Sequence, residues 1–127
     1  MYPTDRQYTK EHEWVMIEDD AATIGITDFA QNQLGDIVFV EIPEKGKQFE
    51  KGDVIGSIES VKAVSEIYAP LSGTIVAVND SLDQAPETVN SSPHGDGWYR
   101  KLQITKREEL DDLLEPAAYE DLVASSS

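Results

Sequence analysis

Alternation of apolar and polar residues along this chain predicts a series of short β-strands. Residues 14–18 and 21–27 flank the pair Asp19-Asp20, which favours a turn, so together they predict a hairpin. Comparable β-rich runs span residues 36–42, 54–58, 74–78 and 98–104. Many short strands with regular turn signals between them favour a small sandwich or barrel, so we expect a mainly β fold.

Three short helices are predicted beside the strands. Thr27 has a side chain suited to capping a helix N-terminus, and Gly35 has the backbone freedom suited to ending one, so a helix is expected between them. The stretch 105–108 has the spacing of a capping box and predicts a second helix, which Pro116 would end. A third helix is expected over residues 117–124.

The chain has 127 residues, the length of one domain, and no apolar run approaches the roughly 20 residues of a membrane span. We therefore expect a single domain over residues 1–127, with its core over about 8–122 and flexible termini over 1–7 and 123–127. The first residues lack the pattern of a secretory signal or a transit peptide. This predicts a cytoplasmic location, or the mitochondrial matrix if a presequence has been removed.

Charge and cysteine content exclude some classes of function. With 25 acidic and 10 basic residues the net charge is −15, which argues against binding to nucleic acid or to an anionic membrane, because both need a positive footprint. An acidic surface suits docking against a basic face of a partner protein, or simply maintains solubility. The chain has no cysteine, so any thiol chemistry must belong to an attached group.

Lys62 is the strongest candidate for chemistry. It lies between two β-rich runs, where a hairpin tip is expected, and its small neighbours Ser60 and Ala63 would leave its side chain accessible. Glu59 and Glu66 favour the charged ammonium, which is not nucleophilic, so an enzyme would have to remove its proton before the amine could be acylated. Lys62 is thus either an attachment point or an ordinary solvated lysine.

No set of residues in the sequence predicts catalysis or a metal site. His12 and His94 are far apart in the sequence and come with no third ligand at a zinc-binding spacing. The chain has no Gly-rich phosphate loop and no serine in a nucleophile-elbow motif. We therefore expect neither a metal nor enzymatic turnover by the chain alone.

The segment Glu59-Ser60-Val61-Lys62-Ala63 resembles the lipoylation segment of the glycine cleavage system H protein family. Further segments resemble motifs of the same family, in the same order: 8–15 (YTKEHEWV), 25–30 (GITDFA), 34–41 (LGDIVFVE), 69–73 (APLSG), 89–93 (VNSSP) and 97–98 (GW). Motifs in the family's order cover nearly the whole chain, which makes a chance match implausible.

This resemblance implies a lipoyl-type barrel-sandwich hybrid of two antiparallel sheets, with short flanking helices that include a C-terminal helical segment. It also implies that a lipoate ligase or lipoyltransferase attaches lipoate to Lys62, within the context of Glu59, Ser60, Val61 and Ala63. The arm would carry the aminomethyl group from a pyridoxal-phosphate glycine decarboxylase to a tetrahydrofolate-dependent aminomethyltransferase, and then electrons to a dihydrolipoyl dehydrogenase. The chain would be a covalent carrier and not an enzyme.

A loaded arm also requires a groove. The aminomethyl adduct on the arm would be prone to hydrolysis, so the arm should dock where water is excluded. The amine at the end of the arm would be cationic, so a carboxylate should be present there. The resemblance implies that Glu11, His12, Glu13 and Glu66 lie at this groove. Members of the family commonly have Asp where this chain has Glu66.

Related carrier domains match less well. Lipoyl domains of 2-oxoacid dehydrogenases usually have Asp-Lys-Ala at the tip and biotin carriers have Met-Lys-Met, whereas this chain has Val61-Lys62-Ala63. Two alternatives stay open. One is a lipoate depot or relay protein, which could share every one of these motifs. The other is an unmodified lipoyl-like interaction module, against which the complete context of Lys62 counts.

Overall fold

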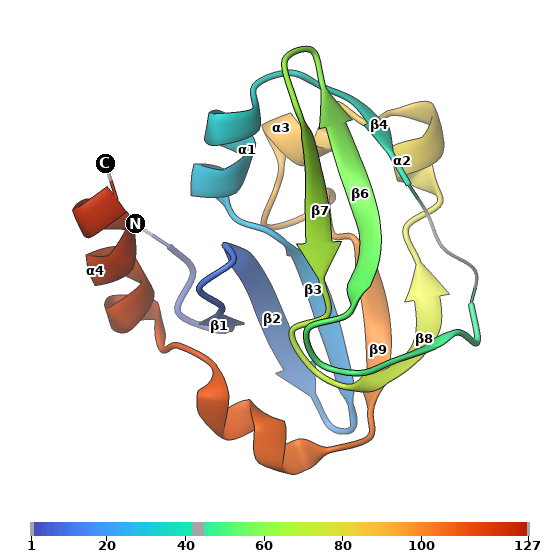
Figure 1. Cartoon of the computed structure of the whole chain (residues 1–127), viewed down its shortest axis with the longest axis vertical. Helices are drawn as coiled ribbons and strands as arrows, with labels where there is room; N and C mark the ends of the chain where they lie inside the picture. Colours follow the sequence, from blue (N-terminus) through green and yellow to red (C-terminus); the bar gives the residue numbers. More distant parts are fainter. Residues whose placement is uncertain (1, 42–44, 127) are drawn as a thin grey trace.

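The computed structural model describes residues 2–41 and 45–126, which form two antiparallel β-sheets (Figure 1). In this part of the chain the larger sheet has the strand order β1 (Gln7–Tyr8), β2 (Glu13–Glu18), β3 (Ala21–Ile26), β9 (Arg100–Ile104), β8 (Gly73–Val78) and β5 (Gln48–Phe49). The smaller sheet has the order β4 (Ile37–Val40), β6 (Val54–Ser60) and β7 (Val64–Tyr68).

Short helices surround the sheets. They are α1 (Asp28–Leu34), α2 (Ser81–Gln84), α3 (Thr88–Ser91), the 3₁₀ helix η1 (Arg107–Asp112) and α4 (Pro116–Ser126). None of the helices in the described residues has the length and apolar character needed to cross a membrane. The predicted fold, mainly β with two antiparallel sheets and short helices that include a C-terminal one, is confirmed.

The core lies between the two sheets. Val15, Ile24 and Leu102 of the larger sheet belong to the same buried cluster as Ile58 and Ile67 of the smaller sheet. Strand residues alternate between the two faces of a sheet, and β3 accordingly contributes every second side chain to this cluster. The β6–β7 hairpin therefore has one face in the core, and this fixes its position on the larger sheet.

The C-terminal segment covers β1 through a separate aromatic cluster. Tyr119 of α4 stacks on Tyr8 of β1 with ring centroids 4.7 Å apart, and Trp14 belongs to the same buried group. Leu114 exchanges two backbone hydrogen bonds with Tyr8, at 2.9 and 2.7 Å. Helix α4 consequently lies next to β1, although the two come from opposite parts of the sequence, as Figure 1 shows.

Most predicted elements are confirmed with small changes at their ends. The predicted hairpin is β2 and β3. Helix α1 begins after Thr27, whose side chain accepts a hydrogen bond from the Ala30 N–H, and it ends at Gly35, where φ is 81°. The predicted end of a strand at residue 42 lies outside the described residues. Strands β1 and β5 and helices α2 and α3 were not predicted, because elements of two to four residues are too short to show a period.

The helix predicted after the capping box is present, but its type and its N-terminal capping differ from the α-helical pattern of a capping box. This stretch forms the 3₁₀ helix η1, and no side-chain hydrogen bond caps it. The Thr105 N–H, which Glu108 would accept in a capping box, instead donates to the Ser72 carbonyl at 3.2 Å. The Glu109 carboxylate also accepts the Ser72 N–H at 2.7 Å. Pro116 was expected to end a helix but begins α4, because a missing N–H is tolerated in the first turn of a helix.

Candidate functional site

Lys62 lies at the tip of the β6–β7 hairpin, which projects beyond the other strands (Figure 1). Ser60 holds the turn: its N–H donates to the Ala63 carbonyl at 2.8 Å, and its hydroxyl oxygen accepts the N–H groups of Lys62 at 3.3 Å and Ala63 at 3.0 Å. Neither Val61 nor Lys62 has a positive φ, so the turn is not of a primed type, as expected without Gly or Asn. Ser60 organises the backbone while Lys62 stays exposed.

The hairpin tip is tied to the segment that follows α1. The Val61 N–H donates to the Asp36 carbonyl at 3.0 Å, although the Val61 side chain is 68% exposed. The stem of Lys62 lies over Gly35, because a Cβ added to this glycine would be 3.4 Å from Lys62 Cε. The lysine is accessible from solvent, and the far end of its side chain lies beside the end of α1.

A pocket of about 160 Å³ lies between α1 and the β6–β7 hairpin, and we call it the groove. Its walls combine apolar side chains with three carboxylates. The lining residues are Glu11, His12, Glu13, Ile26, Phe29, Ala30, Gln33, Leu34, Ile58, Ser65, Glu66 and Ile67. None of these described residues is a lysine or an arginine. An apolar groove with acidic groups suits an alkyl chain that ends in a positive charge.

Glu13 is the most deeply buried acid of the groove, with 3% of its surface exposed. Its Oε2 accepts the Tyr68 N–H at 2.9 Å, and its Oε1 accepts the Thr9 hydroxyl at 3.1 Å. Burial away from water raises the pKa of Glu13 from 4.5 to about 8, although both hydrogen bonds oppose this rise. The carboxyl group is therefore harder to ionise than that of an exposed glutamate, and a positive charge nearby would favour its ionised form.

His12 contributes an imidazole to the same groove. Its backbone has a φ of 67°, a left-handed conformation that is uncommon for residues other than glycine. The Thr27 N–H donates to the His12 carbonyl at 3.0 Å, and the imidazole packs on Phe29 with ring centroids 4.7 Å apart. Burial lowers the pKa of His12, while nearby Glu11 acts in the opposite direction. The imidazole is therefore mainly neutral at neutral pH.

The structure brings the predicted groove residues together. All four line the groove: Glu11, His12, Glu13 and Glu66. The other predicted residues flank Lys62 around the tip: Glu59, Ser60, Val61 and Ala63. Glu59 is exposed and does not line the groove. The roles of all these residues toward a lipoyl group stay predictions.

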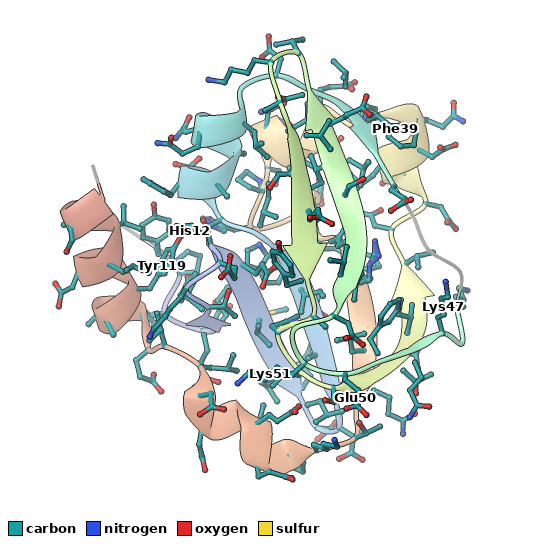
Figure 2. All side chains as sticks on the ribbon, in the orientation of Figure 1. His12, Phe39, Lys47, Glu50, Lys51 and Tyr119 are labelled. Carbon is teal, nitrogen blue, oxygen red and sulfur yellow. The ribbon has the colours of Figure 1, made fainter. Side chains whose placement is uncertain are left out.

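Sequence reasoning missed Phe29 and Tyr119, whose rings pack against His12. Figure 2 shows His12 and Tyr119 next to each other beside α4. Tyr119 comes from the opposite end of the chain. Its one signal in the sequence is that it is the only aromatic residue in the segment predicted as the third helix.

Comparison with known proteins identifies the family. The family model described as Glycine cleavage H-protein matches residues 6–126. The chain belongs to this family. The glycine cleavage system H protein of Thermotoga maritima is 55% identical over 119 residues, which cover 94% of this chain and 96% of that protein. A probable glycine cleavage system H protein of Haloarcula marismortui is 50% identical over 121 residues, which cover 95% of each chain.

The fold is also similar to a solved H-protein structure. The crystal structure of a glycine cleavage system H protein from Mycobacterium marinum matches with a TM-score of 0.85 and 37% identity, covering 94% of this chain and 97% of that one. The family resemblance inferred from the motifs is confirmed, and with it the lipoyl-type fold. Membership of the H-protein family supports a lipoyl-carrier role in the glycine cleavage system.

Proposed function

We propose that Lys62 is the attachment residue for lipoate, and that the chain carries the aminomethyl group of glycine cleavage on this arm. The supporting observation is that one hairpin presents Lys62 at its tip and lines the groove with its two strands. A group attached to Lys62 starts beside α1, which forms another wall of the groove. Lipoate would supply a disulfide able to accept and release the aminomethyl group.

The groove residues would shelter the end of this arm. Ile58 and Ile67 offer an apolar wall that excludes water from the carried group. Glu13 would hold the positive charge of the amine, because its ionised form is favoured once a cation is near. The hydrogen bonds from Tyr68 and Thr9 already support such an anion. Glu66, which is exposed, would offer its carboxylate to the amine at the side of the groove open to solvent.

We propose the following order of partners for this carrier. A lipoate ligase or lipoyltransferase would modify Lys62, and a pyridoxal-phosphate glycine decarboxylase would then load the aminomethyl group. A tetrahydrofolate-dependent aminomethyltransferase would remove this group, and a dihydrolipoyl dehydrogenase would reoxidise the arm. The net charge of −15 suits docking against basic faces of these enzymes. The chain itself would have no turnover.

Intact mass measurement with peptide mapping tests the attachment site, after incubation with lipoate, ATP and a lipoate ligase. We expect one lipoyl addition at Lys62 in the wild-type chain and none in Lys62→Arg, which keeps the charge of the side chain. Lys47→Arg is the matched control, since Lys47 is an exposed lysine on a different segment (Figure 2). This control should be modified like the wild-type chain.

Two other results would change the proposal. If the wild-type chain is not modified by a ligase that modifies another lipoyl protein, the chain is an unmodified interaction module. If the modified chain accepts no aminomethyl group from the decarboxylase but passes its lipoyl group to other proteins, it is a lipoate depot.

A further inference from the structure

The hydroxyl group of Tyr119 joins α4 to two walls of the groove. Its oxygen is 2.8 Å from His12 Nδ1 and 2.7 Å from Thr27 Oγ1. Tyr119 is fully buried, and stacking on Tyr8 fixes its ring. His12 lines the groove directly, and Thr27 caps α1, whose residues form a second wall. One hydroxyl group therefore contacts both the His12 ring and the cap of α1.

The hydrogen-bond partners of the Thr27 and Tyr119 hydroxyl groups define which of the two donates to the other. Thr27 is fully buried, and its hydroxyl oxygen accepts the Ala30 N–H at 3.3 Å. Among the described residues, the Tyr119 oxygen is the only acceptor within reach of the Thr27 hydroxyl proton. Buried hydroxyl protons are nearly always paired, so Thr27 donates to Tyr119. Tyr119 then donates its own proton to Nδ1 of His12, and the imidazole proton lies on Nε2.

We propose that Tyr119 is a positioning residue of the groove, which holds the neutral imidazole of His12 with its proton on Nε2 and its ring against Phe29. The phenol can donate only to an unprotonated Nδ1, so this hydrogen bond favours neutral His12 over the imidazolium. The packing of His12 on Phe29 is maintained at the same time, because the bond limits rotation of the ring.

A neutral His12 matters because of the groups that face it. Glu11, Glu13 and Glu66 line the same groove, and Tyr119 approaches from α4. An imidazolium at this position would pair with these carboxylates and would repel a cationic amine. Neutral His12 leaves the carboxylates available to the amine of the carried group. This inference rests on the proposed function, since it assumes that the groove receives that amine.

Tyr119→Phe tests the inference, because it removes the hydroxyl group and keeps the stacked ring. The matched control is Tyr8→Phe, which removes a hydroxyl group from the same cluster; this one donates to the Pro3 carbonyl at 2.7 Å and does not line the groove. NMR of the His12 ring during a pH titration reports its tautomer and its pKa in the unlipoylated chain. We expect the Nε2–H tautomer in the wild-type chain and in Tyr8→Phe. Tyr119→Phe should show mixed tautomers and a raised pKa of His12.

A second measurement follows the loss of the aminomethyl group from lipoylated, loaded protein by intact mass. We expect this loss to be roughly fivefold faster in Tyr119→Phe, the factor that one hydrogen bond of ordinary strength gives, and unchanged in Tyr8→Phe. Melting temperatures of both variants show how much of any effect is a general loss of stability, which should be similar in the two.

The outcomes separate this inference from the proposed function. An unchanged tautomer and pKa of His12 in Tyr119→Phe would overturn the inference, whatever the arm does. An altered tautomer with an unchanged rate of loss would overturn the positioning role toward the carried group. Failure of the proposed function would appear separately, as the absence of a lipoyl addition at Lys62.

Discussion

At the scale of single residues, the buried acid Glu13 should make the stability of the protein depend on pH. Its pKa of about 8 in the folded chain lies above the 4.5 of an exposed glutamate, so the folded state binds a proton that the unfolded chain releases. The contribution of Glu13 to the free energy of unfolding is therefore fully present below about pH 4.5 and is lost as the pH rises toward 8. Glu13→Gln cannot ionise, and should be more stable than the wild-type chain by roughly 1–3 kcal/mol at about pH 9, with little difference at about pH 5.

Urea denaturation at the two pH values measures this difference. Glu66→Gln is the control, because Glu66 lines the same groove but is exposed, and it should change the free energy of unfolding by less than about 0.5 kcal/mol at either pH. The same pH dependence in Glu13→Gln as in the wild-type chain would contradict the raised pKa.

At the scale of elements, a long-range contact of Glu109 anchors η1 to the segment before β8. Glu109 Oε1 accepts the N–H of buried Ser72 at 2.7 Å, and Glu109 Oε2 lies 2.9 Å from the Ser72 hydroxyl. Glu109→Gln removes the charge from this contact and should lower the free energy of unfolding by about 1–2 kcal/mol. The exposed neighbour Glu108 offers a matched control, and Glu108→Gln should cost less than about 0.5 kcal/mol. Equal losses in urea denaturation would show that the contact with Ser72 contributes nothing specific.

The limits of α1 were predictable from local signals at both of its ends, whereas the type and capping of η1 were not. Helix α1 has Thr27 at its start and Gly35 at its end, and both act there as their residue types predict. The capping-box pattern over residues 105–108 was equally local, but the Thr105 N–H, which Glu108 would accept in such a box, donates to Ser72 from a different part of the chain. Sequence patterns do not show such long-range competition.

The candidate site shows the same difference between features with local sequence signals and features that depend on long-range contacts. The hairpin that carries Lys62 follows from the β-rich runs on either side of it. The groove residues followed from family motifs. The contact of Tyr119 with His12 depends on how α4 packs against β1, which joins opposite ends of the chain. No local pattern around either residue indicates that they meet.

At the scale of the whole molecule, the net charge of −15 opposes folding through self-repulsion. Ion pairs such as Lys51–Asp112, at 2.7 Å, lie at the surface and can involve only a minority of the acidic groups, because 25 acidic residues face 10 basic ones. Raising NaCl from about 20 to about 500 mM should therefore raise the melting temperature by roughly 5 °C. Calorimetry measures this shift, and KCl should act equally if screening is the cause. A melting temperature that falls with salt would contradict dominant self-repulsion.

The β6–β7 hairpin carries Lys62 and also lines the groove. This arrangement would determine how tightly the groove needs to bind an arm on Lys62. An arm attached to Lys62 would be tethered to its own docking site. Docking would then be intramolecular, with an effective concentration in the millimolar range typical of short flexible links. Contacts too weak to bind a free ligand would then keep the arm docked for most of the time. A partner enzyme could take the arm from such weak contacts without unfolding any part of the carrier. Proximity, and not tight binding, would keep the arm in the groove.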